Sequence, residues 1–167
     1  GHEFVGEVLD APSRSWVGKR VVADINLACG ECSTCRRGDP HHCPERSVLG
    51  ILRKDGAFAE QVTLPQRNLV PVPPDLSDEA AVFAEPLAAA YEILEQVELP
   101  ASGRVLVLGD GKLGLLSALV LRTVVANVTL LGRHASKLAV AAAQGVKVAT
   151  ELDADGFDVV VEATGQP

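Results

Sequence analysis

Four cysteines lie close together in the first third of the chain and are its only cysteines. They are Cys29, Cys32, Cys35 and Cys43, so the spacing is C-x2-C-x2-C-x7-C. A tetrahedral zinc ion prefers four thiolates that converge on one point, and short spacings in a turn-rich loop supply them. Four thiolates also saturate the ion and leave no position open for a substrate. The spacing therefore predicts a structural zinc lobe over residues 28–44.

Disulfide bonds, redox chemistry and nucleic-acid binding are the alternatives to structural zinc. Disulfides need an oxidising compartment, and nothing in the sequence indicates export. A thioredoxin-type C-x-x-C lies at a strand–helix junction and needs no further cysteines. A zinc ribbon that binds nucleic acid would be basic, whereas this chain has a formal charge of −7. His41 and His42 lie inside the lobe, but with four thiolates available we expect them to be solvated and not to bind metal.

A glycine-rich turn follows an apolar strand, residues 105–108, and opens a predicted helix, residues 112–124. In the pattern G-x-G-x-x-G the first glycine makes the turn, and the second lets the backbone approach a pyrophosphate. The third lets the helix pack on the strand, and the helix N-terminus faces the anion. The alternative is a tight turn without a ligand. We expect the turn to bind a dinucleotide through Gly109, Asp110, Gly111, Lys112, Leu113 and Gly114.

The end of the next predicted strand indicates which dinucleotide is bound. A site for NAD usually carries Asp or Glu about 20 residues after the motif, where it bonds the ribose hydroxyls. This chain has Gly132, Arg133 and His134 instead, with Lys137 one helical turn later. No carboxylate would repel a 2′-phosphate there, and Arg133 could bind it through two parallel hydrogen bonds. The sequence favours NADP over NAD, unless Arg133 and Lys137 are merely solvated charges.

A third group of residues combines one imidazole with two carboxylates. His2 and Glu3 are neighbours near the start of the chain, and Glu85 precedes a proline in a helical stretch. Taken singly, each is an ordinary surface or helix-boundary residue. Together they suit a catalytic zinc that keeps one position open for substrate, because such sites use three protein ligands of these types.

Two kinds of secondary structure must position these groups. In residues 1–76, Val-rich runs bounded by turn residues predict strands over 4–9, 20–25 and 57–64. Residues 77–103 link the two halves, with a helix over 78–97 that begins after Ser77 and is interrupted near Pro86. In residues 104–167, strands over 105–108, 128–131, 146–149 and 157–161 alternate with helices over 112–124 and 136–143. This alternation of apolar strands and helices predicts a doubly wound parallel sheet, so the fold class is α/β plus β.

The composition is that of a globular protein. The chain has 167 residues, of which 47% are hydrophobic and 22% charged. The acidic charge argues against a nucleic-acid surface, and no apolar run is long enough for a membrane span. We expect a cytoplasmic protein. Because the first residues already resemble a strand and the last follow one, we also expect the chain to be an internal piece of a longer protein.

These residues together resemble the zinc-dependent medium-chain dehydrogenase/reductase family, and the resemblance covers essentially the whole chain. The family's G-H-E-x-x-G-x-V stretch matches residues 1–8, its four-cysteine lobe matches 29–43, and its cofactor turn matches 109–114. A later D-V-x-x-E-x-x-G strand matches residues 158–165, in which Thr164 is a further cofactor-binding candidate. The resemblance implies part of a GroES-like β domain, followed by part of a Rossmann domain.

The resemblance also implies roles for single residues. His2 matches a ligand of the catalytic zinc, and Glu3 matches either the adjacent acidic ligand or a group that supports a ligand. Glu85, in the sequence Glu-Pro-Leu, resembles the glutamate of the branch that contains sorbitol, threonine and glucose dehydrogenases. The Gly132-Arg133-His134 sequence resembles that of members that use NADP.

The implied function is zinc-dependent transfer of hydride between NADP, or NAD, and an alcohol, polyol, sugar or amino alcohol. Members of the family usually form homodimers or homotetramers. The family's first catalytic ligand is a cysteine that would precede residue 1, so we expect the chain by itself to be inactive. Two alternatives remain: a quinone-reductase-like protein, which would lack the four-cysteine lobe, and a zinc-stabilised dinucleotide sensor that performs no catalysis.

Overall fold

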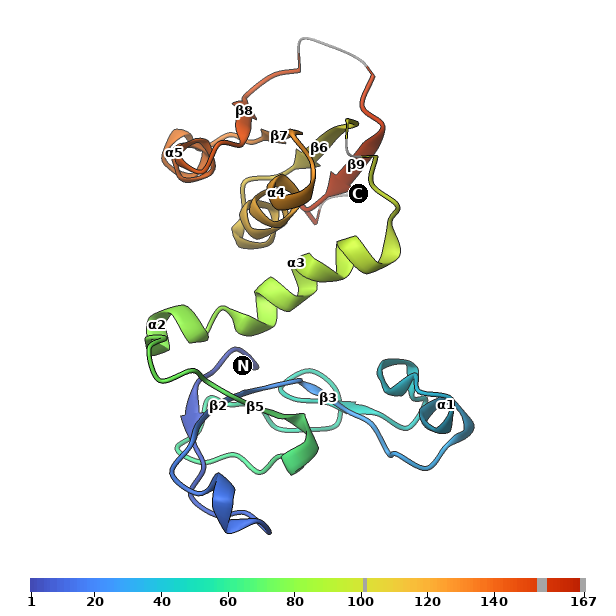
Figure 1. Cartoon of the computed structure of the whole chain (residues 1–167), viewed down its shortest axis with the longest axis vertical. Helices are drawn as coiled ribbons and strands as arrows, with labels where there is room; N and C mark the ends of the chain where they lie inside the picture. The colour runs from blue at the N-terminus through green and yellow to red at the C-terminus, as the bar shows by residue number, and fades with distance from the viewer. Residues whose placement is uncertain (101, 153–155, 166–167) are drawn as a thin grey trace. The chain divides into compact units, whose positions relative to one another are not determined.

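The structure is a computed structural model and describes residues 1–100, 102–152 and 156–165. The chain divides into two compact units, residues 1–85 and 86–167. The first is built from short antiparallel strands and loops, and the second from a parallel sheet and helices (Figure 1). The predicted fold class, β followed by α/β, is confirmed.

The first unit holds two small antiparallel sheets. One has the order β1 (Gly6–Glu7), β2 (Arg20–Ala23), β5 (Leu69–Pro71), and the other pairs β3 (Asn26–Leu27) with β4 (Ser47–Val48). Ile25, Val48 and Leu49 form its buried core, against which Phe4 and Leu64 pack. The remaining elements are short: the 3₁₀ helices η1 (Arg14–Trp16), η2 (Pro40–His42) and η3 (Gln66–Asn68), and the helix α1 (Ser33–Arg36).

Three strand predictions in this unit were too long or wrong. The strand predicted over residues 4–9 is reduced to Gly6–Glu7, and the one over 20–25 ends at Ala23. Residues 57–64 do not form a strand, because within the described residues no other segment pairs with them in a ladder. A Val-rich run favours extended backbone, but a strand needs a partner for its N–H and C=O groups.

The linking helix is interrupted earlier than predicted. Ser77 is the N-cap of α2 (Asp78–Ala81), and its hydroxyl accepts a hydrogen bond from the N–H of Ala80. The break comes at residues 82–83, and α3 (Ala84–Gln96) then runs without interruption. Pro86 lies in the first turn of α3, where a backbone N–H has no partner within the helix, so proline is tolerated there. The predicted break near Pro86 was therefore misplaced.

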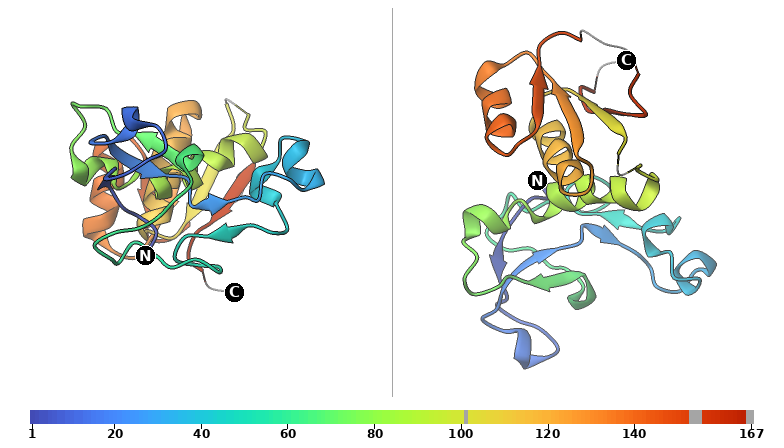
Figure 2. Two further views of the ribbon diagram at one scale, coloured as in Figure 1. Left: turned by 90° about the horizontal axis from the view of Figure 1, so that it is seen from below. Right: turned by 45° about the horizontal axis from the view of Figure 1, so that its top comes forward.

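The second unit is a four-stranded parallel sheet of β6 (Arg104–Leu108), β7 (Asn127–Leu131), β8 (Lys147–Ala149) and β9 (Val159–Glu162). Its order is β8-β7-β6-β9. Helices α4 (Lys112–Val124) and α5 (Ala135–Ala143) contact each other and cover β6, β7 and β8 (Figure 2). Fully buried side chains of the two central strands and α4 form the core, among them Val105, Val107, Leu121 and Leu130.

The strand order determines where a ligand can bind. In the sequence of the chain the sheet grows from β6 outward to β8, and then the chain returns to the other side of β6 to make β9. This is the start of the 3-2-1-4 order of dinucleotide-binding sheets. In such sheets ligands bind beyond the carboxyl ends of the strands where the order reverses, which here is between β6 and β9.

Candidate functional site

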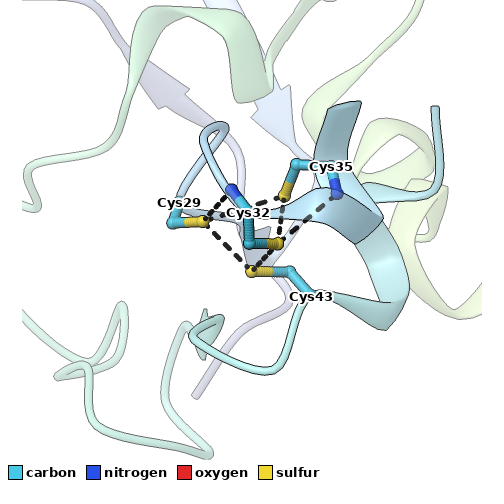
Figure 3. A group of neighbouring side chains, drawn as sticks. All are labelled: Cys29, Cys32, Cys35 and Cys43. Atoms are coloured by element: carbon cyan, nitrogen blue, oxygen red, sulfur yellow. Dashed lines mark hydrogen bonds between the residues drawn. The ribbon is translucent and has the colours of Figure 1, made fainter. Parts of the chain in front are cut away.

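The four cysteine thiols converge at one point in the first unit. Cys32 caps α1, Cys35 lies within that helix, and Cys43 follows η2 and is fully buried (Figure 3). Sulfur–sulfur distances are 3.5 Å for Cys32–Cys35 and for Cys29–Cys43, 3.8 Å for Cys32–Cys43 and 3.9 Å for Cys29–Cys35. Four sulfurs about 2.3 Å from a zinc ion form a tetrahedron with edges of about 3.8 Å. The cluster therefore fits a tetrahedral zinc ion, and none of the four is in a disulfide.

Backbone donors around the cluster favour thiolates. The N–H of Cys35 donates to Sγ of Cys32 at 3.4 Å and is the main cause that lowers the pKa of Cys32 to about 6. The N–H groups of Glu31 and Cys32 lower the pKa of Cys29 in the same way. Burial raises the pKa of Cys35 to about 12. Without a cation the cluster thus keeps part of its protons, and metal binding releases them.

The two histidines of the lobe bond to carboxylates outside the thiol cluster. His41 Nε2 lies 3.0 Å from Asp24 Oδ2, and His42 Nδ1 lies 2.7 Å from Asp39 Oδ1. Both rings are exposed. The expectation that they are solvated holds, but each also has a partner that the sequence did not indicate.

Two residues far from the cysteines in sequence hold the base of the lobe. Arg67 donates to the carbonyl oxygen of Ala28 at 2.6 Å. The side-chain amide of Asn68, which is buried, donates to the carbonyl oxygens of Asp24 and Asn26, both at 2.9 Å. Sequence reasoning missed both residues, because ordinary polar side chains become informative only when the fold brings them to a backbone carbonyl.

His2, Glu3 and Glu85 lie together in the first unit. Their potential ligand atoms are all within 4.8 Å of one another, and His2 Nε2 is 3.8 Å from Glu85 Oε2. Both of these side chains are partly buried, at 31% and 24% exposed. Nitrogen and oxygen ligands at about 2.0–2.2 Å from one zinc ion would be about 3.4 Å apart, so these three side chains lie near the spacing that a shared zinc ion requires.

The segment that carries His2 is held by its backbone. The N–H of Ala57 donates to the carbonyl oxygen of Gly1 at 2.7 Å. A Cβ atom at Gly50 or at Gly56 would lie 2.5 Å from the same oxygen, so both positions exclude a side chain. Their presence in a loop was the only feature of these two glycines visible in the sequence, yet their lack of side chains lets residue 1 approach.

A pocket in the second unit lies at the carboxyl ends of all four parallel strands. Seven of the predicted cofactor residues line it, from the glycine turn, from the turn after β7 and from the end of β9. Lys112, Leu113, Gly114 and His134 are not among its lining residues, whereas Thr150, after β8, lines it and was not predicted. The lining residues are Leu108, Gly109, Asp110, Gly111, Leu131, Gly132, Arg133, Lys137, Thr150, Ala163 and Thr164.

The three glycines of the turn have different roles. Gly109 has a φ of 106°, which L side chains rarely adopt. Gly111 is the N-cap of α4 and has open space where a Cβ would be, so its backbone is accessible to a ligand. A Cβ at Gly114 would overlap the carbonyl oxygen of Gly109, so Gly114 allows α4 to pack on the turn. These roles agree with the glycine pattern of dinucleotide-binding turns.

Asp110 is buried between the glycine turn and the turn that follows β7. Its Oδ2 accepts hydrogen bonds from the N–H groups of Arg133 at 2.8 Å and His134 at 2.6 Å. Nδ1 of His134 lies 3.0 Å from each carboxylate oxygen. The side chain and N–H of His134 are the main causes that hold the pKa of Asp110 at about 2. A Cβ at Gly132 would lie 2.5 Å from Cβ of Asp110.

The charges at the pocket are those expected for an anionic ligand. Arg133 and Lys137 line it and are exposed. At the end of β9, the N–H and the hydroxyl of Thr164 donate to Oε1 of Glu162, which lowers the pKa of that carboxyl. The two positively charged lining side chains are thus at the β7 end of the pocket, and Glu162 is not among the lining residues.

Comparisons with known proteins agree with this geometry. The alcohol dehydrogenase GroES-like domain family matches residues 1–74. The chain is 37% identical to L-threonine 3-dehydrogenase of Chelativorans sp. (strain BNC1), over 99% of the chain and 52% of that protein. It therefore spans about half the length of the curated relatives it matches.

Solved structures match nearly the full length of this chain. One, described as a zinc-binding dehydrogenase from Sinorhizobium meliloti 1021 bound to NADP, has a TM-score of 0.87 at 30% identity and matches 99% of this chain and 54% of its own. Another, an alcohol dehydrogenase from Escherichia coli CFT073 complexed with NADH, has a TM-score of 0.79 at 30% identity. It matches 100% of this chain and 48% of its own.

A GroES-like β unit with a four-thiol cluster, followed by a parallel sheet with a glycine-rich turn, defines a zinc-containing protein of the dinucleotide-binding class. Over nearly its whole length the chain is similar to zinc-dependent medium-chain dehydrogenases/reductases, and residues 1–74 match the alcohol dehydrogenase GroES-like domain family. Among the residues that the structure describes, no helix is both long and apolar enough to span a membrane.

Proposed function

We propose that this chain is the zinc-lobe and cofactor-turn part of an oxidoreductase that transfers hydride between a nicotinamide dinucleotide and an alcohol, polyol, sugar or amino alcohol. The observation that carries the proposal is the pocket at the reversal point of the parallel sheet, lined by the glycine turn and by two cationic side chains. Such a pocket suits a pyrophosphate at the N-terminus of α4.

NADP is the cofactor that the pocket suits better. We infer that Arg133 and Lys137 face the adenosine ribose, because they line the pocket after β7, the position of the ribose-binding residue in such sheets, and no carboxylate follows that strand. Arg133 can bind a 2′-phosphate through two parallel hydrogen bonds. Because Gly109 and Gly111 have no side chains, a pyrophosphate could come close to their backbone. Thr164 lines the pocket at the β9 end.

We assign the two metal sites to separate residue groups. Cys29, Cys32, Cys35 and Cys43 would hold a structural zinc ion that fixes the lobe, while His2, Glu85 and, directly or through a ligand, Glu3 would contribute to a catalytic zinc ion. A zinc ion with one open position supplies a Lewis acid that lowers the pKa of a substrate hydroxyl. The contribution of these protein residues is to hold their imidazole and carboxylate groups in place. Glu85 favours polyol, sugar and amino-alcohol substrates, in line with the threonine dehydrogenase relatives.

The wider organisation follows from the same proposal. We assign residues 1–76 to the GroES-like domain, 77–103 to the linking helices and 104–167 to the dinucleotide-binding domain. We further propose that the intact protein is a cytoplasmic homodimer or homotetramer, because thiols without disulfides suit a reducing compartment and the family commonly has these assemblies.

The test uses the full-length protein, with NADPH and NADH formation followed over a panel of polyols, sugars and amino alcohols. We expect turnover that is sensitive to a chelator and prefers NADP. The variant Glu85→Ala should lower kcat/KM by about 10- to 100-fold or more, as loss of a metal-site residue does. Glu95→Ala, an exposed carboxylate on the same helix, is the matched control and should leave turnover unchanged.

Two results would contradict the proposal, the first in the role of Glu85 and the second in the activity itself. Unchanged turnover in Glu85→Ala would remove Glu85 from the site. Tight binding of NADPH without turnover of any alcohol would instead identify a zinc-stabilised dinucleotide sensor.

A further inference from the structure

The carboxylate of Asp110 is in the cofactor turn, but it points into the protein. Its side chain is only 9% exposed, and its oxygens face the turn over residues 132–134. Each oxygen has a donor: Oδ2 accepts from the N–H groups of Arg133 and His134, and the ring of His134 lies 3.0 Å from Oδ1. Its hydrogen-bonding capacity is therefore largely used before any ligand arrives.

Asp110 and Gly132 fit each other. A Cβ at Gly132 would lie 2.5 Å from Cβ and 2.6 Å from Oδ2 of Asp110, so residue 132 has no room for a side chain while residue 110 is Asp. Gly132 directly follows β7, near the place where an NAD site carries its ribose-binding carboxylate. In this chain a carboxylate from the preceding turn fills that space, and it bonds to protein donors.

The same contacts determine what the pocket presents to a ligand. Two backbone N–H groups and one imidazole surround the negative charge of Asp110, which weakens its effect on a bound phosphate. The backbone on both sides of the Arg133 Cα is fixed by these two N–H bonds, so the direction in which its side chain leaves the turn is fixed as well. Arg133 and Lys137 remain on the lining of the pocket.

We propose that Asp110 is a positioning residue for cofactor selectivity, because it holds the 132–134 turn so that Arg133 and Lys137 face the 2′-phosphate of the adenosine ribose. The inference rests on the proposed dinucleotide function and adds to it. Both carboxylate oxygens of Asp110 bond to the 132–134 turn, so its effect on the 2′-phosphate would be transmitted through Arg133.

The test compares two nucleotides that differ only in the 2′-phosphate, 2′,5′-ADP and 5′-AMP, by titration calorimetry on the intact protein. We expect the wild type to bind 2′,5′-ADP more tightly. In Asp110→Asn, an isosteric change that replaces one acceptor oxygen by a donor, the ratio of the two affinities should fall by about tenfold. Both nucleotides need the same folded pocket, so any unfolded fraction of the variant cancels from this ratio.

Two further variants separate positioning from general damage. Asp158→Asn removes another carboxylate that accepts a backbone hydrogen bond, in this case from the N–H of Arg104 to Oδ2 at 2.7 Å. Neither Asp158 nor Arg104 lines the pocket, so this variant should leave the ratio unchanged. Arg133→Ala should lower the ratio by itself. Adding Asp110→Asn to Arg133→Ala should then change the ratio by less than about twofold, because residues that act through one another are not additive.

Each contrary outcome has a separate meaning. If the wild type binds neither nucleotide, the proposed dinucleotide function fails and this inference fails with it. If it binds both without preference, the dinucleotide function stands and the inference is overturned. The inference is also overturned if Asp110→Asn leaves the ratio unchanged, raises it, or lowers it equally in the Arg133→Ala background.

Discussion

At the scale of single residues, the ionisation of Asp110 is linked to folding. In the folded protein its carboxylate accepts hydrogen bonds from His134 and Arg133, which hold its pKa at about 2, against an ordinary value near 3.8. The folded state therefore prefers the charged form. These bonds stabilise the fold fully above the unfolded pKa, and their contribution is lost as the pH falls through the folded pKa.

The first prediction concerns the pH dependence of stability. The difference in unfolding free energy between the wild type and Asp110→Asn should shrink as the pH falls from about 4 to about 2. Urea unfolding, followed by circular dichroism at several pH values on metal-free protein, measures this difference. A difference that does not vary over this range would show that the carboxylate is not preferentially charged in the folded state.

The second prediction concerns zinc in the lobe. Cys43 is fully buried, and its sulfur lies 3.5 Å from that of Cys29. Cys43→Ser should lower the zinc affinity by at least about 100-fold, because a hydroxyl is a poor substitute for a thiolate ligand. Metal analysis after dialysis against a weak chelator measures the loss.

The matched control for that variant is His41→Ala in the same lobe. The ring of His41 bonds to Asp24 and lies outside the thiol cluster, so its removal should leave the zinc content unchanged. Loss of zinc in His41→Ala, or full retention in Cys43→Ser, would mean that the ligand set differs from the four cysteines.

At the scale of secondary-structure elements, two glycines of one turn separate folding from binding. Gly114 lies where α4 packs on the turn after β6, and a Cβ there would overlap the carbonyl oxygen of Gly109. Gly111 caps the same helix, has ordinary backbone angles of −71° and 176°, and has open space around it. Gly114 is thus needed for the packing of the turn, whereas Gly111 leaves the turn accessible to a ligand.

The third prediction uses these two glycines. Gly114→Ala should lower the free energy of unfolding by about 1–3 kcal/mol or more, the usual cost of overpacking. Gly111→Ala should lower it by less than about 1 kcal/mol but should weaken NADPH binding, because its methyl group would occupy the side from which a pyrophosphate approaches. Thermal melting and titration calorimetry on both variants distinguish these effects. Equal stability of the two variants would contradict the packing role of Gly114.

Elements with local signals could be predicted from the sequence, and those that depend on distant partners could not. Helix α4 has the bounds that the sequence predicted, residues 112–124, because a glycine cap and an apolar face are local features. Residues 57–64 were wrongly predicted as a strand, because their own residue types do not reveal whether another segment lies beside them to form hydrogen bonds. Pro86 marked the neighbourhood of a helix break but not its position, since proline is accepted in a first turn.

The site shows the same division. The cysteine cluster is encoded in one short stretch, so the spacing sufficed to expect that the four thiols converge. The contact between Asp110 and the turn after β7 joins residues 23 and 24 positions apart, and the sequence could not indicate it. In the glycine motif Asp110 occupies only a variable position of the turn. Its buried carboxylate became evident from the side-chain contacts in the structure.

At the scale of the whole molecule, the chain consists of two units with separate buried cores. The first unit packs around Ile25, Val48 and Leu49, and the second around the parallel sheet and α4. All four thiols belong to the first unit. The metal should therefore stabilise one unit directly and the other hardly at all.

The fourth prediction concerns removal of the metal from the intact protein. After treatment with a strong chelator, amide hydrogen exchange should accelerate over residues 26–48, which include the lobe and the β3–β4 pair that flanks it. Exchange in β6, β7 and α4 should stay within about threefold of the untreated protein, because their core contains no metal ligand. Simultaneous loss of protection in both units would show that the two unfold as one.

The placement of the four thiols within residues 29–43 has a consequence for how the protein matures. These ligands leave the ribosome before Leu69–Pro71, the strand that pairs with β2. Closing so short a loop around an ion costs little chain entropy, so the lobe can take up its metal while the sheet beside it is still incomplete. In a cell short of zinc, maturation of the lobe should thus be delayed from this early stage, whereas we expect the parallel sheet of the second unit to assemble without the metal.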